Sequence, residues 1–130
     1  MLIMVMNFLK KWQVKPMAVN SKQKGARFER ELAKKFRELG FEDSRRTAQY
    51  CGNTGDASDV VGLPGIHVEA KHQETMRLYD WIEQAKRDAE SGGNNALPAV
   101  FHKKNKAEIL VTMTFDSFMK IYKGWCKSNE

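Results

Sequence analysis

Three side chains in the middle of the chain have the chemistry to act together on a phosphate ester: Asp59, Glu69 and Lys71. Residues two apart in a β-strand point to the same face, about 6.5–7 Å from one another, so a strand over 66–71 would set Glu69 beside Lys71. Mg²⁺ binds carboxylate oxygens, and an ammonium group stabilises charge that develops on a phosphate. We therefore interpret Asp59 and Glu69 as ligands of a divalent metal ion and Lys71 as a catalytic cation.

A β-hairpin is the element that must position these groups. Two apolar, β-branched segments, residues 58–62 and 66–71, flank the turn signal Pro64-Gly65. The register of this hairpin decides the site. A three-residue loop or a bulge brings Asp59 beside Glu69, whereas a four-residue turn sends the Asp59 side chain to the other face. We predict the register of the three-residue loop or bulge, in which Asp59 lies beside Glu69.

Hydrophobic periodicity predicts an α/β chain in the order helix, three strands, helix, two strands, helix. The expected elements are a helix from an Asn20-Ser21 cap to Leu39 with Gly40 as its stop, an extended segment over 41–47, the hairpin, a helix over 78–91, strands over 99–102 and 109–113, and a helix over 115–123. The expected buried residues of the three helices are Phe28, Leu32, Phe36 and Leu39, then Leu78, Trp81, Ile82 and Ala85, then Phe118 and Tyr122. A mixed sheet with helices on its faces is the natural packing of such elements. Residues 48–57 are expected to form a loop.

Composition indicates one globular domain with an anionic partner. The chain has 130 residues, 42 % of them hydrophobic and 29 % charged, which is enough for a core of its own. The formal net charge is +6, and a basic domain of this kind favours a polyanion such as nucleic acid.

Several other classes of protein are excluded or disfavoured. The two cysteines, Cys51 and Cys126, are far apart, so we expect neither a disulfide framework nor a cysteine–histidine zinc site, and we expect a reducing, cytoplasmic compartment. The apolar segment over residues 1–9 is far shorter than the roughly 20 residues that span a bilayer, so we expect no membrane partner. A glycine-rich phosphate loop is missing, which disfavours a nucleotide hydrolase.

The spacing of Asp59, Glu69 and Lys71 resembles the core motif of the PD-(D/E)xK nuclease superfamily, with Ser58 where the superfamily name has Pro. Upstream, the segment Lys24-Gly25-Ala26-Arg27-Phe28-Glu29-Arg30-Glu31-Leu32 resembles the opening helix of archaeal-type Holliday-junction resolvases and their phage relatives. The resemblance covers about residues 20–115. It implies a restriction-endonuclease-like fold, a mixed central sheet flanked by helices. We assign the nuclease domain to residues 20–125, with an N-terminal extension of unknown role over 1–19 and a tail over 126–130.

The resemblance also implies roles for further residues. Glu29 occupies the position of a metal-linked carboxylate, and the Ala70 carbonyl is an additional metal ligand. Arg30 and Arg46 match basic residues that contact the DNA backbone. Weaker candidates for DNA contact are Lys24, Arg27, Arg45, Lys103 and Lys104. The implied cofactor is Mg²⁺, with Mn²⁺ as a substitute.

These observations together predict a Mg²⁺-dependent endonuclease, phage-encoded and acting in the host cytoplasm, that resolves four-way DNA junctions by paired nicks. Two opposed cuts require two sites, so we expect a homodimer, with part of the contact from apolar residues near the termini and in the middle: residues 1–9, Trp12, Trp81 and Trp125. The alternatives are another nuclease of the same superfamily, nicking or restriction-like, and a non-catalytic DNA-binding module. The complete Asp59, Glu69 and Lys71 set disfavours the module, and a lack of evident paired aromatics disfavours an RNA-binding protein.

Overall fold

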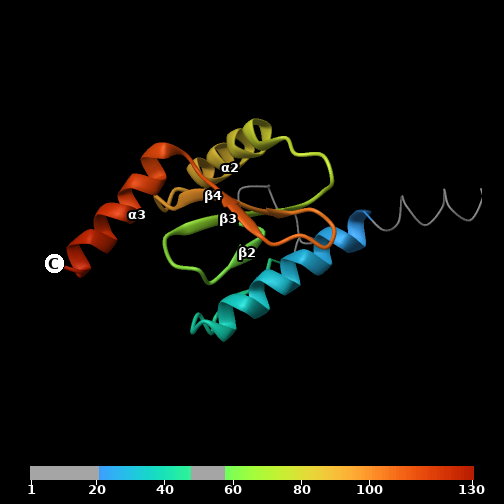
Figure 1. The fold of residues 1–130 in the computed structure, drawn as a ribbon, viewed down its shortest axis with the longest axis horizontal. Coiled ribbons are helices and arrows are strands. Elements are labelled where there is room, and N and C mark those ends of the chain that lie inside the picture. Colours follow the sequence, from blue (N-terminus) through green and yellow to red (C-terminus); the bar gives the residue numbers. More distant parts are fainter. Residues whose placement is uncertain (1–20, 48–57) are drawn as a thin grey trace, which may run out of the picture.

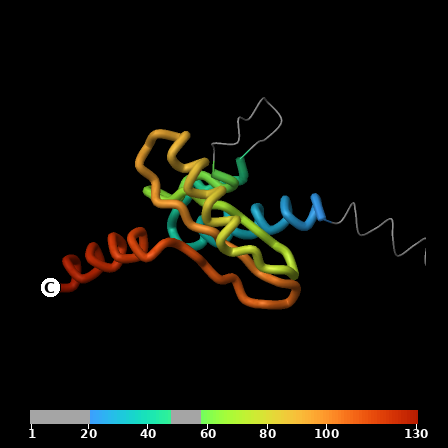
Figure 2. Tube along the Cα trace, turned by 90° about the horizontal axis from the view of Figure 1, so that it is seen from above, coloured from blue at the N-terminus to red at the C-terminus, as the bar shows by residue number. Residues whose placement is uncertain are grey.

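The computed structural model describes residues 21–47 and 58–130, in which a five-stranded sheet lies between two helices (Figure 1). The N-terminal helix (residues 21–38) covers one face, and α2 (Leu78–Gly92) covers the other. A third helix, α3 (Phe115–Ser128), follows the last strand and projects away from the sheet (Figure 2). The predicted Asn20 cap, the extension over 1–19 and the loop over 48–57 lie outside the described residues.

The strands follow one another across the sheet in chain order. They are β1 (Arg45–Arg46), β2 (Val60–Val61), β3 (Ile66–His72), β4 (Leu97–Lys103) and β5 (Leu110–Thr112). Neighbours are antiparallel except β3 and β4, which are parallel because α2 makes the crossover between them. The mixed sheet flanked by helices and the predicted order of elements are thereby confirmed, and β3 is the central strand.

The hairpin between β2 and β3 has the predicted register. The Ile66 N–H donates to the Leu63 carbonyl at 3.2 Å, and Gly65 lies between them with φ of +79°, a left-handed conformation that glycine adopts without strain. Val60 pairs with Val68. This pairing is that of a three-residue loop, and it excludes the four-residue turn.

A second glycine allows β1 to approach this hairpin. Gly62 has φ of +91°, and a Cβ atom built on it would lie 2.5 Å from the Cα of Ser44. The Ser44 hydroxyl, in a residue that is 2 % exposed, donates to the Gly62 carbonyl at 3.2 Å. Only a residue without a side chain permits this contact.

The two faces of the sheet hold separate hydrophobic clusters, as the helical periodicities predicted. The N-terminal helix packs Phe28, Leu32 and Phe36 against Val60 and Val68. On the other face, the α2 residues Trp81, Ile82 and Ala85 pack against Val100 of β4. These clusters orient β3, because its alternate side chains must enter one cluster or face α2.

The expected burial of three residues, Leu39, Phe118 and Tyr122, is wrong. Leu39 is 74 % exposed, because the helix ends at residue 38 and the chain turns at Gly40, where φ is +106°. Phe118 and Tyr122 of α3 are 52 % and 46 % exposed, because α3 projects away from the sheet and, among residues 21–47 and 58–130, no layer covers this face (Figure 2). Trp81 is 5 % exposed in the core beneath α2, as its helical spacing predicts, so its alternative assignment to a subunit contact is wrong.

Candidate active site

Glu69 and Lys71 lie on the α2 face of β3. The side chains between and beside them, Val68 and Ala70, pack on the opposite face with the N-terminal helix. Glu69 is 4 % exposed, and the Lys71 Nζ lies 3.7 Å from its Oε1 atom. The alternation of the strand therefore produces the predicted pair, and Lys71 is its more exposed member.

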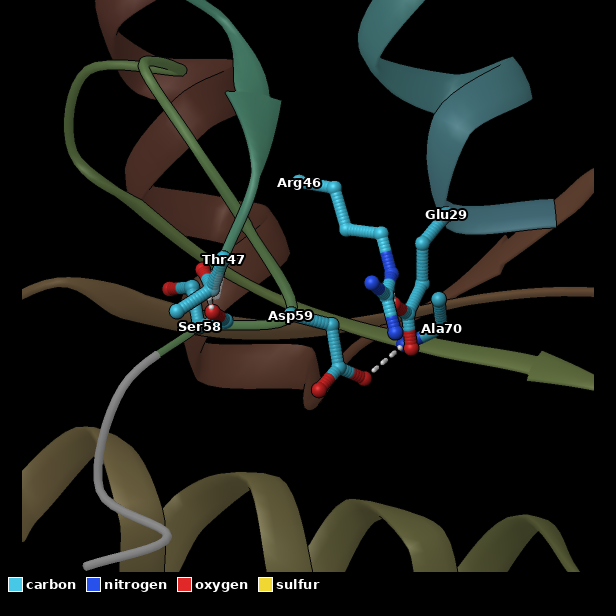
Figure 3. A network of polar contacts seen from close by, with 6 residues as sticks. All are labelled: Glu29, Arg46, Thr47, Ser58, Asp59 and Ala70. Atoms are coloured by element: carbon cyan, nitrogen blue, oxygen red, sulfur yellow. Dashed lines mark hydrogen bonds and ion pairs between the residues drawn. The ribbon is translucent and has the colours of Figure 1, made fainter. Parts of the chain in front are cut away.

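Asp59 joins this pair from the end of β2. Its Oδ2 atom accepts a hydrogen bond of 2.8 Å from the Ala70 N–H (Figure 3). Its carboxyl group also interacts directly with that of Glu69. Its backbone is held as well, since the Asp59 carbonyl accepts from the Thr47 N–H at 3.0 Å. The structure thus brings Asp59, Glu69 and Lys71 together.

The two carboxyl groups lie in an environment that disfavours their negative charge. Burial and the neighbouring Asp59 raise the pKa of Glu69 to about 8, against the opposing effect of Lys71. Burial also raises the pKa of Asp59, although the Ala70 hydrogen bond and Lys71 lower it. A divalent cation would relieve this repulsion, and two adjacent carboxylates are oxygen donors that suit one. The residues present therefore fit a divalent metal ion.

Glu29 approaches the site from the N-terminal helix. Its Oε2 atom accepts a hydrogen bond of 2.5 Å from the Arg46 Nε atom (Figure 3). Burial raises the pKa of Glu29, the Arg46 hydrogen bond lowers it, and the charge of Asp59 raises it. The structure thus places Glu29 within electrostatic reach of Asp59. It also shows that Arg46 engages a carboxylate of the site.

The other candidate DNA contacts fall into two groups. Those on the exposed surface are Arg27, Arg30, Arg45 and Lys104. Two lysines are instead paired with carboxylates, Lys24 with Glu74 at 3.9 Å and Lys103 with Glu31 at 3.8 Å. A cleft of about 550 Å³ between the start of the N-terminal helix and the end of β3 is lined by Lys24, Gly25, Ala70 and Lys71, among others. This cleft therefore borders the site at Lys71.

The structure adds two residues that the sequence analysis did not assign to this site, His67 and Asp88. One ligand atom each of His67, Glu69 and Asp88 lies within 4.8 Å of the other two. His67 was recognisable in principle, because it precedes Glu69 by two residues on the same strand. Asp88 was not, because only the packing of α2 on the sheet brings it there.

The fold and the site define a PD-(D/E)xK nuclease. The model of a family described as phage putative PDDEXK endonucleases matches residues 20–128, and the chain belongs to this family. No curated protein sequence matches the chain.

A solved structure supports the fold. The Archaeoglobus fulgidus protein Hjc, described as a Holliday junction resolvase from an archaeal hyperthermophile, is similar with a TM-score of 0.51 and 24 % sequence identity, over 68 % of this chain and 76 % of that one. The restriction-endonuclease-like architecture is thereby confirmed. In the part of the chain that the structure describes, no helix combines the length and apolar character needed to cross a bilayer.

Proposed function

We propose that this protein is a Mg²⁺-dependent, structure-selective DNA endonuclease that resolves four-way junctions by paired nicks. The observation that carries the proposal is the convergence of Asp59, Glu69 and Lys71 at the β2–β3 hairpin. Membership of a phage endonuclease family supports phosphodiester hydrolysis. The preference for junctions is supported by similarity in fold to a protein described as a Holliday junction resolvase.

The chain's own residues would divide the chemistry among them. Asp59, Glu69 and the Ala70 carbonyl would hold the ion, and Mn²⁺ would substitute for Mg²⁺. What the ion supplies when bound is neutralisation of phosphate charge and a more acidic water. Lys71, whose Nζ lies 3.7 Å from the Glu69 Oε1 atom, would stabilise the charge that develops on the phosphate. Glu29 would assist as a metal-linked carboxylate, and its hydrogen bond with Arg46 would set its position.

DNA would reach this site across the basic surface of the N-terminal helix and the cleft beside Lys71. Arg30 is exposed and is suited to bidentate contact with phosphate. Such contacts with the backbone supply most of the affinity without reading sequence, as expected of an enzyme that selects structure.

Two arguments support the homodimer in this proposal: the need for two cuts and the exposed aromatic face of α3. One chain has one Asp59–Glu69–Lys71 site, and two opposed nicks need two sites related by a symmetry axis. The exposed face of α3, formed by Phe118, Tyr122 and Trp125, carries rings in successive stacked contacts of 6.1 Å. Trp125 is 60 % exposed, and exposed aromatic surface of this kind is typical of interfaces. We assign this α3 face to contact with a second copy of the chain.

A cleavage assay with matched substrates tests the proposal. A labelled four-way junction and a linear duplex of the same arm sequence would be incubated with Mg²⁺, with Mn²⁺ and with chelator, and Asp59→Asn would serve as the inactive control. We expect symmetric nicks in the junction, in the presence of either ion, and an intact linear duplex. Equal cutting of both substrates would indicate a nicking or restriction-like nuclease instead. Junction binding without cleavage in either ion would indicate a non-catalytic module.

A further inference from the structure

His67, Glu69 and Asp88 form a compact cluster between β3 and α2. Their nearest ligand atoms, an imidazole nitrogen and two carboxylate oxygens, all lie within 4.8 Å of one another. His67 is 3 % exposed and Glu69 is 4 % exposed, so these two donors lie between packed elements, whereas Asp88 is only partly buried. Buried carboxylates need a compensating partner, and Lys71, whose Nζ lies 3.7 Å from the Glu69 Oε1 atom, supplies one for that residue.

The packing of two elements holds the cluster in place. His67 and Glu69 share a face of β3 because they are two residues apart. Asp88 follows Ala85 by three residues on α2, and Ala85 is fully buried against the sheet, so Asp88 lies on the same side of the helix. Both elements are anchored by their own hydrophobic contacts, so the donors converge without relying on a bound ligand.

The charges of the cluster favour a cation. Glu69 has a carboxylate on each side, Asp59 from β2 and Asp88 from α2. The donor set differs from that of the Asp59 site because it includes an imidazole nitrogen. One nitrogen with two carboxylate oxygens suits Zn²⁺, Co²⁺ or Mn²⁺, whereas Mg²⁺ takes oxygen donors in nearly octahedral geometry.

We propose that His67, Glu69 and Asp88 form a second divalent-metal site, preferring Zn²⁺-like ions to Mg²⁺, which shares Glu69 with the Asp59 site. This inference rests on the proposed function only because the two sites share the Glu69 carboxylate. An ion bound here would link α2 to β3 through Asp88 and the two β3 donors. The competing arrangement is a metal-free tie, in which the imidazole bridges the two carboxylates by hydrogen bonds.

Calorimetric titration of the full chain with Zn²⁺, in excess Mg²⁺ and without DNA, separates these arrangements. His67→Gln and Asp88→Asn each replace one ligand group with a neutral amide of similar size, which is a weaker donor to a metal ion. The matched control is Asp80→Asn, an exposed aspartate of the same helix. We expect the wild-type and control proteins to bind Zn²⁺ alike, and the two variants to bind it more than about tenfold more weakly. Co²⁺ in place of Zn²⁺ should give visible absorption bands that His67→Gln alters.

Unchanged Zn²⁺ affinity in folded His67→Gln and Asp88→Asn proteins would overturn the proposal and leave the metal-free tie. If neither variant folds, the Asp59→Asn protein decides, because it retains all three donors. A rise in its melting temperature with Zn²⁺ but not with Mg²⁺ supports the site, and no rise with Zn²⁺ overturns it. None of these readouts involves DNA, so a failure of junction cleavage is distinguishable from a failure of the second metal site.

Discussion

The Ala70 N–H donates a hydrogen bond of 2.8 Å to the Asp59 carboxylate. Ala70 is the residue between Glu69 and Lys71, so the strand that carries two of the proposed catalytic side chains also orients the third through its backbone. A backbone donor survives substitution of the side chains on either side of it. The three positions therefore permit separate tests of chemistry without loss of the hairpin.

Replacement of the site residues is expected to abolish cleavage and spare DNA binding. Asp59→Asn, Glu69→Gln and Lys71→Ala should each lower junction cleavage by at least about 100-fold, since each removes a charge that acts on the metal or the phosphate. Junction affinity should be unchanged or tighter for the carboxylate variants, because phosphate contacts elsewhere supply it. Single-turnover cleavage and gel-shift titrations measure the two effects. A variant that cuts at near the wild-type rate would show that the site is assigned wrongly.

The two arginines are expected to differ. Arg30 is exposed, and Arg30→Ala should weaken junction binding and lower the slope of log K against log salt by about one. Arg46 is hydrogen-bonded to Glu29, so Arg46→Ala should weaken binding and also slow cleavage through the displaced carboxylate. Glu38→Gln, an exposed change on the N-terminal helix, is the control. If the slope of log K against log salt stays at the wild-type value in both arginine variants, neither arginine contacts a phosphate and both are ordinary surface charges.

The stability of the metal-free protein should fall as pH rises. Burial raises the pKa of Glu69 from 4.5 to about 8, so the folded chain keeps a proton that the unfolded chain releases within that window. Stability decreases with pH wherever the folded state binds more protons, and the pKa values of Asp59 and Glu29 are raised in the same direction. Thermal unfolding in chelator, at about pH 7 and about pH 8.5, should therefore show a lower melting temperature at the higher pH; below this interval the pKa values of His72 and His102, which burial lowers, act in the opposite direction.

Glu69→Gln provides the control for this pH dependence, because glutamine does not titrate. Its melting temperature should fall by less over the same interval, and Mg²⁺ added to the wild-type protein at the higher pH should restore part of the loss. Identical pH profiles of the two proteins would contradict the raised pKa of Glu69.

The α3 face is expected to mediate dimerisation. Phe118→Glu combined with Tyr122→Glu places charges on exposed stacked rings, so it should produce monomers without unfolding the sheet. Light scattering over a dilution series measures the mass, and Lys123→Glu, an exposed change on the same helix, is the control. Paired nicks should give way to single nicks in the monomeric variant. A wild-type protein that is monomeric at micromolar concentration and makes unpaired nicks would contradict the resolvase proposal.

Two glycines should respond to alanine in opposite ways. Gly62→Ala should destabilise the protein strongly, because the new Cβ would lie 2.5 Å from Ser44 Cα and φ is +91°. Gly25 lies in the N-terminal helix with open space at the Cβ position, so Gly25→Ala should stabilise by about 0.5–1 kcal/mol. Chemical denaturation measures both changes. Equal effects would mean that the approach of β1 to the hairpin is not needed for folding.

Local pattern by itself determined much of this protein. Turn chemistry at Pro64-Gly65 and apolar alternation predicted the hairpin and the Glu69–Lys71 pair, because strand geometry repeats every two residues whatever surrounds it. Helical spacing likewise predicted Phe28, Leu32 and Phe36 as core residues. These are short-range relationships, which neighbouring residues in the chain are enough to define.

Only the tertiary structure decided what depends on distant parts of the chain. It pairs Arg46 with Glu29 and brings Asp88 of α2 to Glu69, contacts that no spacing along the sequence encodes. It also reverses the expected burial of Phe118 and Tyr122, because amphipathic periodicity identifies an apolar face but not whether another layer covers it. Burial is likewise what raises the pKa of Glu69, since the free energy of a charge is set by everything packed around it.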